Sequence, residues 1–297
     1  MSIIEKVMDK LDQDGDSDEQ SRKENGDSVA GKQEKAENNN VNELSEQVQR
    51  NPEENKKNYV ELDFEKLEQR GILTPSSVNV TLSEQLRRIK MPLLANAFGR
   101  SKLDIESRNM IMVTSSVQNE GKSFTSLNLS MSIAKEFNHT VLYIDADVTQ
   151  RAMDKLLNLG KKPGLVDILL DNEFELPDLL LKTNVPRLTM LPSGRPYDKV
   201  TELWSSHRMG SLMDELSQRY NDRIILFDTP PLLQDSSASM LANLVGQIVI
   251  VVEAEKTPRH LVEEAVSLLD GPQYVGLVLN KSNQRETGDY GYYYGSG

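Results

Sequence analysis

Three segments of the chain each place residues that can bind phosphate or a metal ion directly after an apolar run. The first is Ser116–Ser123, of sequence Ser-Val-Gln-Asn-Glu-Gly-Lys-Ser, which follows the apolar residues 110–113. The second run ends at Asp145 and Asp147, and the third ends at Asp228, which Thr-Pro-Pro follows. Any one of them could arise by chance, but together and in this order they indicate a site for ATP and magnesium.

The first segment has the composition of a phosphate-binding loop. Such a loop points backbone N–H groups inward at the start of a helix, where the helix dipole also favours anions. Gly121 permits the tight turn, Lys122 would reach the β- and γ-phosphates, and the Ser123 hydroxyl would bind Mg²⁺. The strict pattern has glycine at the position of Ser116, so for this segment alone an ordinary helix start with a lysine and a serine is the alternative.

The acidic residues suit metal-assisted chemistry. Asp228 follows four apolar residues, as a Mg²⁺-binding carboxylate at the end of a strand would, and the prolines after it weaken the alternative of a helix cap. Asp145 and Asp147 are two residues apart, so in extended backbone both point to one side. Two close carboxylates repel each other unless a cation separates them or one is protonated. One could help hold Mg²⁺ while the other accepts a proton from an attacking hydroxyl; an acidic pair at the surface of a loop is the alternative.

A framework of alternating strands and helices would position these residues. Apolar strand-like runs occur near Ile111, Val141, Leu188, Ile224, Ile248 and Val275. Helical segments at 123–137 and 260–269 lie between them, and two more, at 59–71 and 81–99, precede them. This alternation predicts an α/β fold of three layers, with a mostly parallel sheet covered by helices on both faces. The continuously apolar residues 248–252 predict a strand that is buried on both faces.

Composition excludes several kinds of site. The 297 residues include no cysteine, which rules out disulfides and thiolate chemistry, and no apolar run of about 18 residues that could span a membrane. The net charge of −12 argues against nucleic acid as a partner. The domain itself is expected at residues 58–283, and a flexible tyrosine-rich tail at 284–297.

The N-terminal residues differ in composition from the rest. Residues 1–11 predict a short amphipathic docking helix, with apolar residues at 3, 4, 7, 8 and 11 on one face. Docking onto a protein is favoured over lipid, because Glu5, Asp9 and Asp12 would be repelled by anionic headgroups. Residues 12–57 hold 13 acidic and 7 basic residues with no aromatic residue, and this composition predicts a disordered acidic linker.

The three motifs together resemble the bacterial tyrosine kinases, which use a P-loop, and most closely the autokinases of exopolysaccharide clusters, including those found with exosortase systems. The resemblance covers roughly residues 80–297. It implies a P-loop NTPase fold, ATP and Mg²⁺ as cofactors, catalytic roles for Lys122, Asp145, Asp147 and Asp228, and metal binding by Ser123, Asp145 and Asp228. It also implies nucleotide contacts from Ser116, Asn119, Glu120, Gly121, Lys122, Ser123, Phe124 and Asn280, the last at the adenine edge.

Two departures from the family's pattern concern the phosphate site. The family usually has a basic residue two positions after the second aspartate, where this chain has Thr149, and Arg151 is the nearest candidate. The usual Pro-Gly before Glu-Gly-Lys-Ser is Gln118-Asn119. Partitioning and division-site ATPases are the competing relatives, but their loop carries an extra lysine where this chain has Val117.

Two further features fit the resemblance. Glu84, Arg87 and Lys90 are spaced by three residues and are similar to the family's element that joins subunits into a ring, although a solvated helix face has the same spacing. The C-terminal cluster of tyrosines resembles the family's autophosphorylated tail, which a neighbouring copy modifies; the acceptors would be Tyr290, Tyr292, Tyr293 and Tyr294. A sticky aromatic tail is the alternative.

The resemblance therefore implies a cytoplasmic tyrosine autokinase that regulates exopolysaccharide assembly or export. Its partner would be the cytosolic segment of a separate membrane polysaccharide co-polymerase, or chain-length determinant protein, which would recruit it to the inner face of the membrane. Two rivals stay open at this point. One is a switch ATPase of the partitioning type, and the other is a non-enzymatic, ATP-binding scaffold of the co-polymerase.

Overall fold

The structure is a computed structural model that describes residues 58–99, 107–271 and 273–282. These residues all belong to one compact unit. The expected helix at 1–11, the acidic linker at 12–57 and the tyrosine-rich tail at 284–297 lie outside the described residues. None of the helices within the described ranges is long and apolar enough to cross a membrane.

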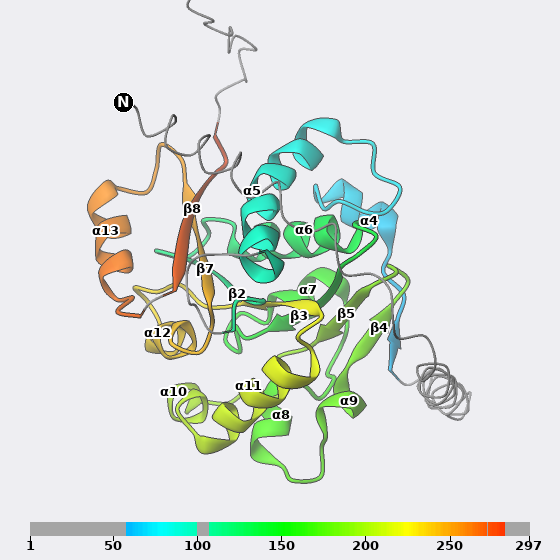
Figure 1. The fold of residues 1–297 in the computed structure, drawn as a ribbon, viewed down its shortest axis with the longest axis vertical. Helices are drawn as coiled ribbons and strands as arrows, with labels where there is room; N and C mark the ends of the chain where they lie inside the picture. Colours follow the sequence, from blue (N-terminus) through cyan, green and yellow to red (C-terminus); the bar gives the residue numbers. More distant parts are fainter. Residues whose placement is uncertain (1–57, 100–106, 272, 283–297) are drawn as a thin grey trace, which may run out of the picture. The chain divides into compact units, whose positions relative to one another are not determined.

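Within the described ranges, eight strands form one sheet in the order β1-β4-β5-β3-β6-β2-β7-β8 (Figure 1). All neighbouring strands are parallel except β4 and β5, so the prediction of a mostly parallel sheet is confirmed. The strands are β1 (Tyr59–Val60), β2 (Met110–Ser115), β3 (Thr140–Asp145), β4 (Leu181–Thr183), β5 (Leu188–Leu191), β6 (Arg223–Asp228), β7 (Gln247–Glu253) and β8 (Tyr274–Asn280).

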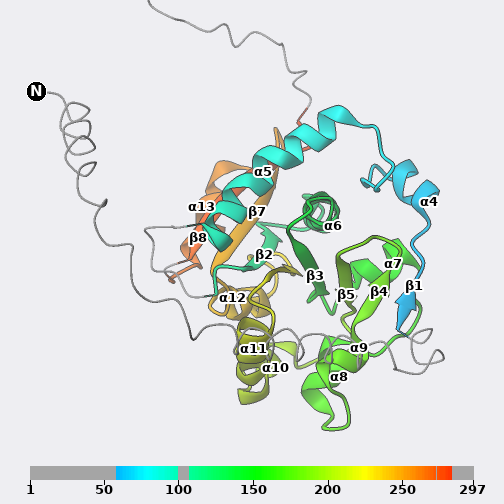
Figure 2. The ribbon, with the colours of Figure 1, turned by 45° about the vertical axis from the view of Figure 1, so that its right-hand side comes forward.

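Helices cover both faces of this sheet (Figure 2). One layer consists of α4 (Phe64–Gln69), α5 (Val80–Phe98), α6 (Lys122–Ala134) and α7 (Ala152–Leu157). The other consists of α8 (Leu165–Leu170), α9 (Leu176–Leu179), α10 (Val200–Trp204), α11 (His207–Arg219), α12 (Ser236–Ala242) and α13 (Arg259–Ser267). The predicted three-layer α/β/α arrangement is therefore confirmed.

Strand residues alternate between two hydrophobic cores, as the period of two in a strand requires. Ile111 and Val113 of β2 pack with α5 and α6, whereas Met110 and Met112 pack on the opposite face with α11 and α12. Residues 248–252 of β7 are all buried and alternate between the same two cores. This confirms the prediction of a strand buried on both faces.

One expected helix is wrong at its start. The sequence predicts a helix over 59–71, but Tyr59–Val60 form β1, and α4 begins only at Phe64. Asn184 holds the extended residue Leu62 by bonding both its N–H and its carbonyl, at 2.9 and 3.0 Å. Asp63 then caps α4 by accepting a hydrogen bond from the Lys66 amide. Contacts with a segment about 120 residues away in the sequence thus decide this conformation.

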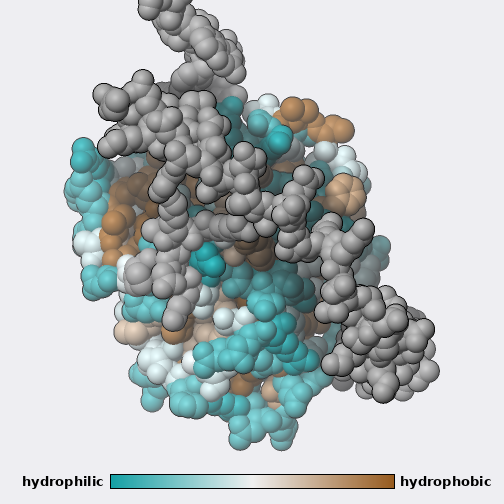
Figure 3. Space-filling view, in the orientation of Figure 1, coloured by the Kyte–Doolittle hydropathy of each residue, from teal (hydrophilic) through white to brown (hydrophobic). Residues whose placement is uncertain are grey.

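The sheet ends at β8, whose outward-facing residues are only partly covered. Val275, Leu277 and Leu279 are 37%, 58% and 71% exposed, and they lie on the face that α13 covers over β7. Apolar surface is visible in the region of α13 and β8 in Figure 3. The nucleotide-binding motifs do not lie on this edge of the sheet, because β2, β3 and β6 are central strands.

Candidate functional site

The three motifs meet on the side of the sheet where the central parallel strands have their carboxyl ends. Strand β6 lies between β2 and β3, and all three are parallel, so their carboxyl ends point the same way. Asp145 is the register partner of Asp228, and the side chains of Asp145, Asp147 and Asp228 are all fully buried. The loop after β2 leads into α6 at Lys122. The fold therefore brings together all four residues predicted to be catalytic.

Backbone conformation explains which loop positions tolerate a side chain. Asn119 and Gly121 have positive φ values of 68° and 99°. A Cβ atom on Gly121 would also lie 2.0 Å from Nδ2 of Asn280, so this position needs glycine for two reasons. Ser116 is not among the described residues with positive φ, which is why serine can stand where the strict pattern has glycine.

Glu120 supports the loop from inside. One oxygen of its buried carboxylate accepts a hydrogen bond from the Val117 amide at 2.7 Å. The other accepts from the Glu253 amide at 3.1 Å and from the Thr257 hydroxyl at 2.5 Å. The side chain expected to contact nucleotide thus connects the loop to the end of β7, and sequence reasoning missed Glu253 and Thr257 as its partners.

The end of β8 holds the same loop from a second direction. Asn280 donates from Nδ2 to the Glu120 carbonyl at 2.8 Å, and Lys281 donates from Nζ to the Asn119 carbonyl at 2.6 Å. The Lys281 ammonium also contacts the Glu253 carboxylate at 3.1 Å. Asn280 therefore lies beside the loop, as a residue at the rim of a nucleotide site would, and its role toward adenine stays a prediction.

Lys122 points its ammonium at the acidic residues. Its Nζ lies 2.5 Å from Oδ2 of Asp147 and 3.5 Å from the Ser123 hydroxyl. Burial by itself would lower the pKa of Lys122, but the nearby charges of Asp228 and Asp147 outweigh it and raise this pKa. The lysine is therefore protonated at neutral pH and positioned to exchange one anionic partner for another.

Asp145 organises the turn that follows β3. Its two oxygens accept hydrogen bonds from the amides of Asp147 and Met153, at 3.1 and 3.0 Å. Burial, and next the neighbouring charge of Asp228, raise the pKa of Asp145 well above its ordinary value. Asp147 in turn accepts from the Gln150 amide at 2.9 Å. The Asp145–Asp147 pair thus has a defined geometry rather than that of a loose surface pair.

Asp228 has an oxygen that no described group satisfies. Its Oδ2 accepts a hydrogen bond from the Tyr143 hydroxyl at 3.3 Å, whereas its buried Oδ1 has no partner among the described residues. Burial raises the pKa of Asp228, although the positive charge of Lys122 and the nearby hydroxyls of Ser123 and Ser126 oppose this shift. A buried, unpaired carboxylate oxygen is costly unless a cation or water completes it. This atom therefore fits the divalent metal that the P-loop motifs imply.

The donors suit a metal that is bound together with a nucleotide. The described residues contain no group of three or more His, Cys, Asp or Glu arranged to hold a metal alone. Mg²⁺ does not need one, because it is commonly held by one or two carboxylates, a hydroxyl and substrate phosphates. Ser123 at the start of α6 and Asp228 at the end of β6 supply such a set.

Tyr143 belongs to this site but was missed by sequence reasoning. Its buried hydroxyl lies between the Ser126 hydroxyl, at 3.2 Å, and Asp228. Burial, and next the charge of Asp228, raise the pKa of this tyrosine well above its ordinary value. It stands two residues before Asp145 in β3, so the alternation of side chains in a strand was a signal that could have found it.

Other predicted residues lie elsewhere. The ring of Phe124 packs against the core under α5 and α6, next to Gly71. Glu84 and Arg87 are exposed on α5 and form a long contact of 3.9 Å. Lys90 is buried and donates to the Ser132 carbonyl at 3.0 Å and to Glu136 at 2.5 Å, so its expected place on an open interface is corrected. The four candidate acceptor tyrosines lie outside the described residues.

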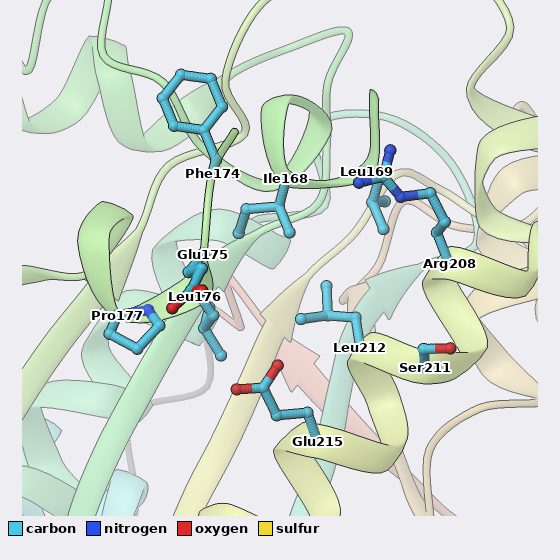
Figure 4. Close-up of a pocket in the computed structure, with 10 residues that line it drawn as sticks. All are labelled: Ile168, Leu169, Phe174, Glu175, Leu176, Pro177, Arg208, Ser211, Leu212 and Glu215. Atoms are coloured by element: carbon cyan, nitrogen blue, oxygen red, sulfur yellow. The ribbon is translucent and has the colours of Figure 1, made fainter. Parts of the chain in front are cut away.

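A cavity of about 550 Å³ between α8, α9 and α11 is separate from these motifs (Figure 4). Its lining combines apolar residues with Arg208, Glu175 and Glu215, and none of the residues predicted for the nucleotide site line it. The phosphate chemistry therefore belongs to the strand ends, not to this cavity.

Comparison with known proteins identifies the family of this chain. The family described as AAA domain matches residues 109–269, more than half of the chain. The tyrosine-protein kinase CpsD of Streptococcus agalactiae is 32% identical over 193 residues, which cover 63% of this chain and 82% of that protein.

Solved structures of kinase domains share the fold. The VpsO kinase domain is 30% identical, with a TM-score of 0.55, and the match covers 66% of this chain and 99% of that one. The kinase domain of the Escherichia coli tyrosine kinase ETK, at 24% identity and a TM-score of 0.60, covers 72% of this chain and 81% of its own and supports the fold alone. With the loop, the paired aspartates and the unpaired Asp228 in place, the chain belongs to the AAA domain family and, within it, to the bacterial P-loop tyrosine kinases.

Proposed function

We propose that this chain is an ATP-dependent protein-tyrosine autokinase that regulates exopolysaccharide biosynthesis or export. One observation carries the proposal most: the unpaired Oδ1 of Asp228 is buried beside a phosphate-binding loop whose lysine faces a second carboxylate. This arrangement leaves one position for a cation and one lysine for phosphate. Phosphoryl transfer needs both, because its catalysis rests on positioning and on neutralising charge.

Each residue has a role in this proposal. Lys122 releases Asp147 and binds the β- and γ-phosphates, together with the loop amides of residues 116–123. Ser123 and Asp228 would hold Mg²⁺, with help from Asp145, and Asn280 would lie beside the adenine. When bound, the metal neutralises charge that develops on the phosphates.

Phosphoryl transfer in this proposal needs only ATP, a tyrosine hydroxyl and a carboxylate of the chain. The tyrosine oxygen forms a bond to the γ-phosphorus, and the bond from that phosphorus to the β–γ bridging oxygen breaks, which releases ADP. The hydroxyl proton passes to Asp145 or Asp147. Asp147 contacts Lys122 at 2.5 Å, whereas both oxygens of Asp145 accept hydrogen bonds from backbone amides. Either carboxylate can therefore be the proton acceptor, and substituting each in turn would identify it.

The acceptors in this proposal are the tail tyrosines at 290, 292, 293 and 294 of a neighbouring copy. Glu84 and Arg87, which are exposed on α5, would contribute to a ring of copies. The cytosolic segment of a separate membrane polysaccharide co-polymerase would activate the chain and recruit it from the cytoplasm to the inner face of the membrane. The docking helix at residues 1–11 would assist that recruitment.

Intact mass spectrometry tests the proposal. Wild type, Lys122→Ala and a truncation after Gly288 are incubated with Mg²⁺-ATP and a candidate co-polymerase segment. We expect wild type to gain up to four additions of about 80 Da each, and both variants to gain none. Lys135→Ala, which alters an exposed lysine just after α6, is the matched control and should behave as wild type.

Two outcomes would contradict the proposal. ATP turnover without any gain in mass would indicate a switch ATPase. Tight ATP binding with neither turnover nor gain in mass would indicate a scaffold.

A further inference from the structure

A basic cavity adjoins the turn that carries the paired aspartates. It has a volume of about 310 Å³, within the range of small-ligand pockets, and four of its lining residues are cationic: Arg151, Lys161, Lys162 and Arg195. Asp167 is the one acidic residue in its lining. These five residues form the basic cavity.

The basic cavity lies on the same side of the sheet as the nucleotide motifs, beyond the carboxyl ends of the strands. Arg151 comes six residues after the end of β3, and Arg195 comes four residues after the end of β5, which is the parallel neighbour of β3. The Arg151 amide donates to the Asp147 carbonyl at 2.8 Å. The cavity wall and the catalytic turn are therefore joined by a direct backbone contact.

The two arginines are held in place by carboxylates. Arg151 contacts Asp154 at 2.5 Å, and its Nε is buried and has no hydrogen-bond partner among the described residues. Arg195 contacts Asp167 at 3.2 Å and Asp171 at 2.5 Å. Such pairing orients the guanidinium groups, and it leaves Nε of Arg151 as a donor without an acceptor.

The two lysines supply the charge that the fold does not compensate. No hydrogen bond or ion pair joins Lys161 or Lys162 to any other described residue, and neither shows a pairing with the nearby acids. Lys161 is exposed and Lys162 is half-buried, so both can turn toward a ligand. Two ammonium groups without a partner among the described residues, next to an unsatisfied guanidinium donor, suit a compact dianion.

We propose that the basic cavity binds a phosphotyrosine side chain from the tail of a second copy. This inference rests on the proposed autokinase function. A phosphotyrosine carries a charge of about −1.5 to −2 and three acceptor oxygens, which complements the cavity. Because an extended chain spans at most roughly 3.3–3.6 Å per residue, one phosphorylated residue in the cavity would keep the neighbouring tyrosines close to the catalytic turn.

The consequence is that the first phosphate on a tail promotes the next. Tethering by an anchored phosphotyrosine raises the local concentration of the remaining hydroxyls at the site. Successive additions to one tail should then be faster than the first, although each phosphate makes the tail more acidic.

Peptide binding tests the cavity independently of catalysis. Fluorescence anisotropy would compare a labelled peptide of residues 284–297 with the same peptide phosphorylated at Tyr290, using dephosphorylated full-length protein. We expect the phosphopeptide to bind about tenfold more tightly, a difference of about 1.4 kcal/mol. The double variant Lys161→Gln/Lys162→Gln should lose this preference. Lys155→Gln/Lys182→Gln makes the same charge change at exposed lysines outside the cavity and should keep it.

Competitors identify the ligand chemistry. Phenyl phosphate should displace the phosphopeptide at lower concentration than inorganic phosphate. Equal displacement by inorganic phosphate would overturn the assignment to phosphotyrosine, since it would indicate a general anion site. Equal binding of the two peptides would also overturn the assignment. So would a loss of ATP affinity in Lys161→Gln/Lys162→Gln as large as its loss of phosphopeptide affinity.

A kinetic measurement separates this inference from the proposed function. Intact mass measured over time should show multiply phosphorylated chains in wild type. In Lys161→Gln/Lys162→Gln the first phosphate should be added at the wild-type rate, and singly phosphorylated chains should accumulate. If wild type adds no phosphate at all, the proposed function fails, while the peptide comparison still decides whether the cavity recognises phosphotyrosine.

Discussion

At the scale of single residues, the site is a balance of buried charges. Asp145 and Asp228 are register partners on the neighbouring strands β3 and β6, and the positive charge of Lys122 interacts with both. Burial raises the pKa of both carboxyls, so without a metal the cluster favours protonation. The residues that a metal and phosphates would stabilise are thus the ones that cost stability without them, as is common at functional sites.

This balance predicts that Asp228→Asn stabilises the nucleotide-free protein while it abolishes phosphate transfer. Because the pKa of Asp228 is raised in the folded state, the folded protein retains a proton that the unfolded chain releases. Its contribution to stability therefore falls as the pH rises from the ordinary carboxyl pKa toward the folded value. Asparagine removes this penalty, so we expect a gain of about 1 kcal/mol at pH 7, or about 2–4 °C in Tm.

Thermal unfolding without nucleotide at two pH values checks this prediction. The advantage of Asp228→Asn should be present at pH 7 and should vanish in acid, below the ordinary carboxyl pKa, where both states are protonated. Asp214→Asn, at an exposed position of α11, is the control and should change Tm little at either pH. A variant that is less stable than wild type at pH 7 would contradict the interpretation of Asp228 as an uncompensated charge.

At the scale of elements, α5 has two separable functions. Lys90 faces inward and ties α5 to the end of α6 through Ser132 and Glu136. The hydrogen bond from Lys90, with burial opposing it, lowers the pKa of Glu136. Glu84 and Arg87 instead face solvent, with side chains 52% and 64% exposed. One helix therefore offers a structural contact and a surface for assembly.

Two substitutions on α5 should separate these functions. Lys90→Ala leaves the Ser132 carbonyl without this donor, and we expect a loss of about 1 kcal/mol, or about 2–4 °C in Tm. Arg87→Ala breaks only an exposed, long contact, and we expect its Tm to stay within about 1 °C of wild type because such pairs contribute little.

Mass photometry supplies the second readout. Arg87→Ala should shift the population toward monomers if this face joins copies, whereas folded Lys90→Ala should assemble as wild type does. Assembly that is lost in Lys90→Ala but retained in Arg87→Ala would contradict this division of α5.

At the scale of the whole molecule, the proposal requires one copy to phosphorylate another. The predicted tail begins four residues after the end of β8, and the nucleotide motifs lie at the ends of central strands. Mixing Lys122→Ala, which keeps its tail, with the active truncation after Gly288 separates the donor copy from the acceptor copy. We expect phosphate on the Lys122→Ala chain only in the mixture, as intact masses would show. A Lys122→Ala chain that stays unmodified while wild type is modified at high dilution would indicate transfer within one copy.

The sequence by itself determined the chemistry and the class of fold. The loop at 116–123, the aspartates at 145, 147 and 228, and the six strands around them were predictable because each follows a local rule of composition or periodicity. Ser116 in place of glycine was an ambiguity of the sequence, and its ordinary φ resolves it.

Only the tertiary structure decided which side chains face the ligand and which support the site. The sequence predicts that Glu120 contacts nucleotide and that Lys90 lies at an interface. In the structure both side chains are buried and form hydrogen bonds to segments far away in the sequence. β1 replaced the start of a helix for the same reason, since it pairs with β4 and Asn184 bonds Leu62 just after it. Such contacts depend on which strands become neighbours in the sheet, and a local sequence pattern does not specify this. The unpaired oxygen of Asp228 and the basic cavity likewise exist only where distant segments meet.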